Sequence, residues 1–222
     1  MILLLRFKKN KVQIMKKIDV RKAGKGDSKF LALSMLKSSR AAKKIGIFDL
    51  IFEVSDNDEL LNKLERLLTS DIKTYCHYSN FLIASIAGED VGTLCNYEPR
   101  IATKELFDKA LEELGVSEEY EERASMISHC AFEADKKTWM LDFLVEKDGY
   151  SDLVIIKELL KKSLLTASLK GYRIVHTMVE IGSADTMMVY KKLGFKIIDE
   201  KRCEVFKENF GRSGVALLEF HL

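Results

Sequence analysis

The sequence predicts a mixed α/β fold of the α+β kind, with helices flanking one central sheet. Strand-like and amphipathic helical segments alternate along most of its 222 residues. Two apolar runs within 79–98 surround the letters AGED, where Gly88 and Asp90 suit a tight turn, and this is typical of an antiparallel hairpin. The strand-like segments 139–146 and 172–181 are joined by a helical segment, and such a crossover makes two strands parallel. We therefore expect a sheet with both kinds of neighbour.

The N-terminal half is expected to contribute one strand and several helices. Residues 17–24 alternate like a first strand, and Asp27 is a candidate N-cap for the helix that follows. Residues 45–53 are apolar and predicted to be helical. The segment 55–70 is a strongly amphipathic helix whose leucines share one face, namely Leu60, Leu61, Leu64, Leu67 and Leu68. The charged segment 99–131 contains the only proline and predicts a helical insertion between strands.

The C-terminal half has a β-α-β-α order. Alternation in the strand 139–146 places Leu141, Phe143 and Val145 on one face. A helix is expected over 153–169, with Gly171 as its C-cap. The elements after it are a strand at 172–181, a short helix at 183–193 that Gly194 ends, and strands at 195–202 and 214–222. We assign 15–222 to a single domain and 1–14 to an N-terminal extension, which leaves Met1 and Met15 as alternative translation starts.

Composition restricts the partners and the compartment. Lys and Arg total 36 against 34 Asp and Glu, a net charge of +2, whereas proteins that bind nucleic-acid backbones carry a marked basic excess. The apolar run at the N-terminus is too short to cross a bilayer. The cysteines Cys76, Cys95, Cys130 and Cys203 form no CxxC motif, which argues against a zinc site. We expect a cytoplasmic protein with four reduced thiols, no metal, and no nucleic-acid or membrane partner.

Residues 181–202, IGSADTMMVYKKLGFKIIDEKR, resemble a segment of the GCN5-related N-acetyltransferase family. Tyr190, Leu193, Gly194 and Phe195 match its pattern of a short helix, Lys-x-Gly-Phe and a strand, while Ser183 stands where the family has Asn. Residues 21–27 resemble the family's opening strand-to-helix signature, 80–94 its central hairpin, and 200–222 the ending of one bacterial branch. The resemblance covers roughly 18–222 and leaves 99–131 unmatched.

The resemblance implies a mostly antiparallel sheet and the transfer of an acetyl group from acetyl-CoA to a primary amine. The acceptor would be a small molecule or a peptide, and a homodimer formed by exchange of C-terminal strands is possible in such folds. Tyr190 occupies the position of the family's frequent general acid. For the general base we favour Asp142, with Glu146, His176 and Glu180 as alternatives.

The implied cofactor site combines backbone groups with a strand-to-helix turn. Strands 139–146 and 172–181 would splay and expose N–H groups near Leu144 and Val145 to the thioester carbonyl. The diphosphate would lie at the start of the next helix. The residues implied there are Ser151, Asp152, Leu153, Val154 and Ile155, with Ser183 on the neighbouring turn.

The turn departs from the family's pattern of Arg or Gln, two variable residues, Gly, a variable residue, and Gly or Ala. In DGYSDLVIIKELL, residues 148–160, these positions fall on Ser151, Val154 and Ile156. Asp152 adds a like charge that costs about 1 kcal/mol in water, and several at a protein surface, unless Lys147 or Lys157 compensates. The alternative is a catalytically inactive binding or regulatory protein of the same fold, in which Ser151 or Asp152 only caps the helix.

Overall fold

The described residues of the computed structural model, 17–116, 119–122, 125, 130–150 and 153–222, form one seven-stranded sheet in the order β1-β2-β3-β4-β5-β7-β6. Within these residues every neighbouring pair of strands is antiparallel except β4 and β5. This confirms the mixed, mostly antiparallel sheet. The strands are β1 (Ile18–Lys22), β2 (Phe81–Ile86), β3 (Glu89–Tyr97), β4 (Trp139–Glu146), β5 (Ile174–Glu180), β6 (Lys196–Arg202) and β7 (Gly214–His221).

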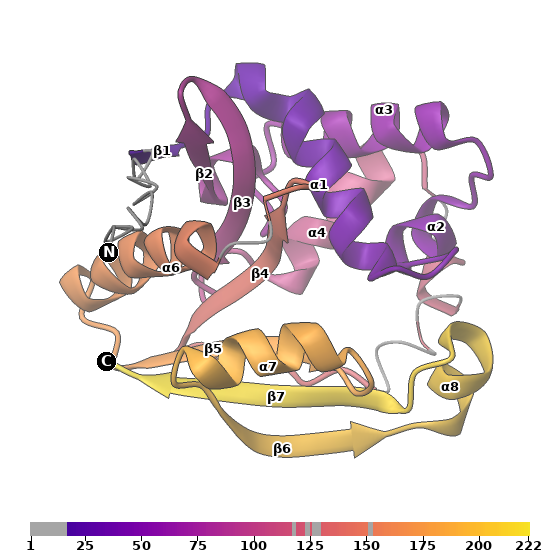
Figure 1. The fold of residues 1–222 in the computed structure, drawn as a ribbon. Coiled ribbons are helices and arrows are strands. Elements are labelled where there is room, and N and C mark those ends of the chain that lie inside the picture. The colour runs from indigo at the N-terminus through magenta and orange to yellow at the C-terminus, as the bar shows by residue number, and fades with distance from the viewer. Residues whose placement is uncertain (1–16, 117–118, 123–124, 126–129, 151–152) are drawn as a thin grey trace, which may run out of the picture.

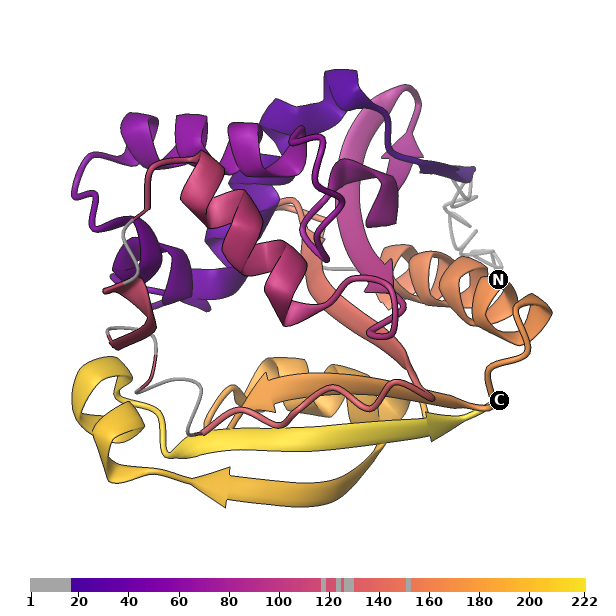
Figure 2. The ribbon, with the colours of Figure 1, turned by 180° about the vertical axis from the view of Figure 1, so that it is seen from behind.

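Helices cover both faces of the sheet, as the two opposite views show (Figures 1 and 2). The α-helices are α1 (Ser28–Arg40), α2 (Ile47–Phe52), α3 (Asn57–Leu68), α4 (Lys104–Glu113), α6 (Leu153–Leu169), α7 (Ala184–Lys192) and α8 (Glu204–Phe210). Short 3-10 helices lie at Lys25–Asp27 and Tyr78–Asn80. Among the described residues, no helix is both long enough and apolar enough to cross a membrane.

Each face of the sheet is covered by its own apolar cluster. One cluster joins the sheet to α1, α2, α3 and α4, and includes Leu31, Phe48 and Leu64. The other joins it to α6 and α7, and includes Leu141, Leu159 and Tyr190. Burial of this apolar surface is what makes the two layers stable against the conformational entropy of the chain.

The two halves of the sheet diverge between β4 and β5. These strands pair in parallel only at Trp139–Val175, Met140–His176 and Leu141–Thr177. Beyond Leu141, β4 remains paired with β3 as far as Glu146, while β5 remains paired with β7 as far as Glu180. The C-terminal parts of β4 and β5 are therefore the two sides of a wedge.

The strand β4 contains an irregularity that the alternation pattern did not predict. Phe143 has a φ of +45°, and the register with β3 shifts between Thr93 and Cys95. Phe143 consequently packs with the cluster of α1 to α4, whereas Leu141 packs with the opposite cluster. The expectation that Leu141 and Phe143 share a face was wrong because this β-bulge inserts a residue and re-aims the side chains after it.

Other local expectations need smaller corrections. Asp27 precedes α1, but its carboxylate accepts hydrogen bonds from the Gly24 amide and from Arg21 instead of capping the helix. The hairpin turn lies at Ala87 and Gly88, both with positive φ, and Asp90 belongs to β3. The helix α8 was not expected in the segment between the last two strands.

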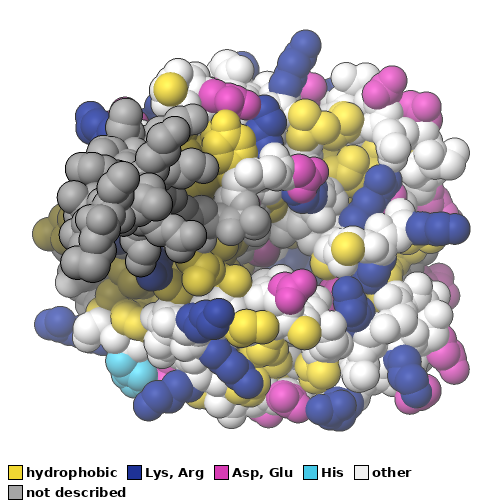
Figure 3. Space-filling view, viewed as in Figure 1, with side chains coloured by type: hydrophobic (Ala, Val, Ile, Leu, Met, Phe, Trp, Pro, Cys, Tyr) yellow, Lys and Arg dark blue, Asp and Glu magenta, His cyan; other side chains and the backbone are white. Residues whose placement is uncertain are grey.

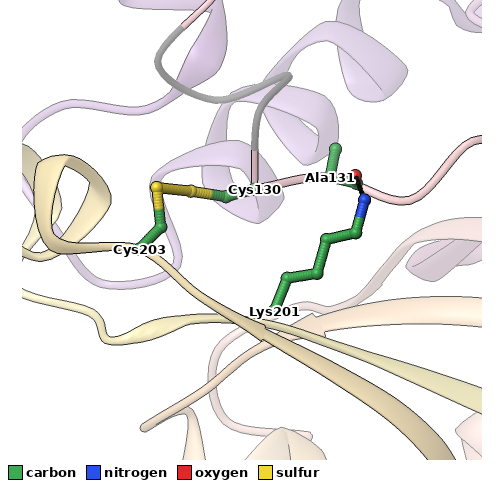
Figure 4. The surroundings of a disulfide bond; sticks show 4 residues. All are labelled: Cys130, Ala131, Lys201 and Cys203. Carbon is green, nitrogen blue, oxygen red and sulfur yellow. Dashed lines mark hydrogen bonds between the residues drawn. A yellow bond between two sulfur atoms is a disulfide. The ribbon is translucent and has the colours of Figure 1, made fainter.

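The cysteines also correct the sequence interpretation. Cys130 and Cys203 form a disulfide with a Cα–Cα distance of 5.9 Å, whereas Cys76 and Cys95 are free and buried. The expectation of four reduced thiols was wrong for the first pair, because only the fold brings together two residues that lie 73 positions apart. The bond joins the end of the 99–131 segment to the start of α8 (Figure 4). Beside it, the Lys201 ammonium donates a hydrogen bond to the Ala131 carbonyl.

Candidate active site

A cavity of about 540 Å³ opens at the wedge, a volume in the usual range for small-molecule sites. Its lining comes from the end of α1 and the loop after it, from α2, from β4 and β5, and from α7 and α8. In the space-filling view, the middle of this face is hollowed between α1 and α7, and side chains of both charges are interspersed around it (Figure 3). The lining includes Asp142, Leu144, Val145, Glu146, Glu180 and Ser183, which the sequence analysis had named.

Asp142 contributes to this cavity a carboxyl group that is a weaker acid than usual. Burial disfavours the charged carboxylate and raises its pKa to about 6, although the Phe143 amide, which donates a hydrogen bond of 2.7 Å, acts in the opposite direction. Its electrostatic neighbours include the half-buried side chains of Tyr75 and Tyr97 and the fully buried thiols of Cys76 and Cys95. Burial raises the pKa of each of these four groups well above its ordinary value. A carboxyl group that titrates near neutrality in a cavity is suited to general base chemistry.

The alternative bases divide into two groups. Glu146 and Glu180 line the cavity. His176 does not, since its Nε2 lies 3.0 Å from the Glu219 carboxylate and its side chain is almost fully buried. The structure therefore brings Asp142, Glu146 and Glu180 together and leaves His176 on another part of the sheet.

The cations of the lining are held by carboxylates and aromatic rings. The Lys37 ammonium lies 2.6 Å from the Asp148 carboxylate and donates to the Glu146 carbonyl. Lys43 pairs with Glu180, and its side chain is only 12% exposed. The Lys43 ammonium also lies over two rings of α8, 5.8 Å and 5.0 Å from the ring centres of Phe206 and Phe210.

The wedge offers features that fit a bound thioester chain. Leu144 and Val145 lie on the edge of β4 that β5 no longer pairs, and both line the cavity. Ser183 precedes α7, and its buried hydroxyl has no hydrogen-bond partner. Because a buried polar group without a partner is costly, this hydroxyl is available to a ligand that enters the wedge.

The start of α6 is only partly described. Ser151 and Asp152 lie outside the described residues. Leu153 is half-buried and Val154 is 39% exposed, so a branched side chain stands at the mouth of the helix. Ile155 is buried against β3, where Gly92 leaves it room: a Cβ on Gly92 would lie 2.9 Å from Ile155 Cγ2. Because the Ile155 side chain is buried, only its backbone can contact a ligand at the start of α6.

Lys147 and Lys157, the two lysines that could offset the negative charge of Asp152, differ in their surroundings. Lys147 lies 2.5 Å from the Glu89 carboxylate, which raises the pKa of Lys147 through a hydrogen bond and Coulomb attraction. Lys147 is therefore already engaged on the β2–β3 hairpin. Lys157 lies exposed on the second turn of α6.

Tyr190 lies in the core beside the wedge and not on the cavity wall. Its ring packs edge-on against Phe195, and its hydroxyl is 3.5 Å from the Thr177 hydroxyl. Thr177 forms the last pair between β5 and β4, so the phenol lies next to the apex of the wedge. Burial raises the pKa of Tyr190 well above its ordinary value, which keeps the phenol protonated. Its role as a proton donor stays a prediction.

Several lining residues were not foreseen. Phe206 and Phe210 lie four residues apart on α8. This spacing in EVFKENF is typical of one apolar face of a helix and could have predicted α8. Lys43 and Tyr75 come from loops, and no local pattern marks loop residues as cavity residues.

Solved structures share this fold, although no family model and no curated protein sequence matches the chain. An N-acetyltransferase from Staphylococcus aureus Mu50 superposes with a TM-score of 0.66 at 17% identity, over 91% of this chain and 100% of that one. A GCN5-related N-acetyltransferase from Kribbella flavida gives 0.58 at 12% identity, over 92% and 98%. The chain has the GCN5-related N-acetyltransferase fold.

One structure with this acetyltransferase fold was solved with a ligand. PaiA N-acetyltransferase from Thermoplasma acidophilum, in complex with coenzyme A, has a TM-score of 0.50 at 14% identity, over 93% of this chain and 99% of that one. Identities this low show the acetyltransferase fold alone. The activity therefore has to be argued from the residues of the wedge.

Proposed function

We propose that this chain transfers an acyl group from acetyl-CoA to a primary amine. The observation that carries the proposal is the wedge of β4 and β5, with Asp142 in the cavity that opens there. Acetyl-CoA, when bound, supplies an acyl group activated as a thioester. A nucleophilic amine has to lose its proton to react, and a carboxyl with a pKa of about 6 is mostly ionised at pH 7 and can accept that proton.

The remaining groups serve binding and orientation in this proposal. Leu144 and Val145 present backbone amides in the wedge, where preorganised N–H groups stabilise negative charge on an acyl oxygen. Ser183 presents its unpartnered hydroxyl from the start of α7. The diphosphate would lie at the start of α6, at Leu153, because helix N-termini bind phosphates.

A non-catalytic protein of the same fold is the second candidate, and one observation favours it. Val154, exposed in the first turn of α6, and Ile156, almost fully buried in the same turn, occupy positions where the family has small residues. Branched side chains keep a diphosphate from approaching the backbone as closely as glycine allows. In this case the cavity would bind a ligand other than acetyl-CoA.

An acyl-transfer assay tests the proposal. Purified protein with acetyl-CoA and a panel of primary amines is expected to release free coenzyme A thiol at a rate that depends on the amine. The matched control for each amine is its N,N-dimethyl analogue, which keeps the body and the charge but cannot form a stable amide. Equal thiol release with both members of every pair would favour the non-catalytic alternative.

A further inference from the structure

Part of the cavity wall is apolar. It consists of α2, β5, β7 and α8 side chains, namely Ile47, Phe48, Met178, Phe206, Phe210 and Val215. Phe206 and Phe210 pack on each other at 4.9 Å between ring centres, and they form one cluster with Val215 and Met178. A ligand with an apolar body that contacts this wall is bound more tightly, because the apolar surface of the ligand then leaves water.

Among the described residues that line the cavity, both cations already have partners. Lys37 is engaged by Asp148, and Lys43 by Glu180 and the two rings of α8. Behind Glu180, Arg212 has its Nε 3.5 Å from the carboxylate and donates its terminal nitrogens to the carbonyls of Gly182 and Ala41. Within the described part of the chain, the Asp142 carboxylate accepts a hydrogen bond from the Phe143 amide, and no ion pair of Asp142 with a cation is found.

We infer that the acceptor is a small primary amine with an aryl or alkyl body and without a carboxylate beside the amine. This inference rests on the proposed function and narrows its acceptor class. The ammonium group pairs with the Asp142 carboxylate, to which it then loses its proton. The body of the amine lies on the α8 side of the cavity, against Phe206 and Phe210. A carboxylate beside the amine would be repelled by Asp142, and the two cations of the described lining, Lys37 and Lys43, are engaged by other carboxylates.

Phenylethylamine and phenylalanine form a matched pair of probes, since they differ only in the carboxylate. We expect kcat/KM for phenylethylamine to exceed that for phenylalanine by roughly 100-fold, a factor that corresponds to an uncompensated like-charge contact in a partly dry site. Calorimetry in the presence of coenzyme A is expected to give the same order for the two dissociation constants. A lower dissociation constant for phenylalanine would overturn the inference.

Phe210→Ala tests the apolar wall. Propylamine, which lacks the ring, serves as the reference acceptor, so the readout is the ratio of the two KM values. In the wild type, phenylethylamine is expected to have the lower KM by roughly 10- to 100-fold, as expected for burial of a ring. The ratio is expected to collapse in Phe210→Ala and to recover in Phe210→Leu, which keeps an apolar side chain. A ratio that stays at the wild-type value in a folded Phe210→Ala protein would contradict the inference.

Failure of this inference and failure of the proposed function give different results. If acetyl-CoA does not bind to the wild-type protein, the proposed function itself is wrong. If acetyl-CoA binds and amines are acetylated, but phenylalanine or another amino acid is preferred, only the acceptor class is wrong.

Discussion

Asp142→Asn is expected to lower kcat/KM for amine acetylation by 100- to 10,000-fold, the usual worth of a general base. The amide keeps the shape of the carboxyl group but cannot accept the proton at neutral pH. The wild-type pH profile should also change slope near the pKa of about 6. Below that pH Asp142 must lose a proton before it can accept one from the bound ammonium, so log(kcat/KM) rises with a slope of about 1, and above it the profile levels off.

The variant separates this role from a structural one. In Asp142→Asn the slope is expected to be about 1 throughout, with no break near pH 6, because the amine must then lose its proton to solvent before it reacts. Tyr75, Cys76, Cys95 and Tyr97 do not disturb the comparison, since their raised pKa values keep them neutral in this range. Asp199→Asn, an exposed carboxyl on β6, is the matched control and should leave the profile intact. A break near pH 6 that persists in Asp142→Asn would assign the base to another group.

Asp142→Asn is expected to be more stable than the wild type at neutral and higher pH, although it is less active. The folded pKa of about 6 lies above the ordinary carboxyl pKa of 3.8, so the neutral form favours folding below about pH 4. This contribution to stability is lost as the pH rises through 6. At pH 8, Asp142→Asn should therefore be more stable than the wild type by up to about 3 kcal/mol. The gain should shrink towards pH 4, which thermal melts at both pH values measure.

Removal of the Cys130–Cys203 disulfide has the second large expected effect. A cross-link over 73 residues restricts the unfolded chain and contributes up to roughly 4 kcal/mol in the chain-entropy estimate. The double variant Cys130→Ala/Cys203→Ala should therefore melt roughly 5–15 °C below the wild type. Ala131, Phe206 and Phe210 belong to the cavity wall, so the KM for the amine should rise more than the KM for acetyl-CoA.

Thiol counting and a reductant provide the controls. Without reductant, two of the four cysteines are expected to react with a maleimide in denaturant, and all four after reduction. A dithiol reductant should lower the melting temperature of the wild type and leave that of the double variant unaffected. Four reactive thiols in protein purified under oxidising conditions would show that the bond does not form.

Much of the architecture was predictable from local patterns. The amphipathic spacing of α3 and the apolar runs of β2 and β4 predict these elements because the same periodicity decides which side chains are buried. The parallel neighbours β4 and β5 follow from the crossover helix α6. The wedge and its cavity then follow from where that parallel pairing stops.

What could not be predicted depends on contacts between distant segments. The bulge at Phe143 arises from the register with β3, which alternation within β4 cannot reveal. The disulfide and the wall of α8 require the 99–131 segment to meet the C-terminal strands. The raised pKa of Asp142 comes from burial, a property that the residue type alone does not show.

A calorimetric titration of the purified protein with acetyl-CoA tests the central claim most directly. If the wedge and the start of α6 bind the thioester and its diphosphate, saturable heat with a stoichiometry of about one per chain is expected, with a dissociation constant in the micromolar range. No binding heat with millimolar acetyl-CoA and a folded protein would contradict the claim.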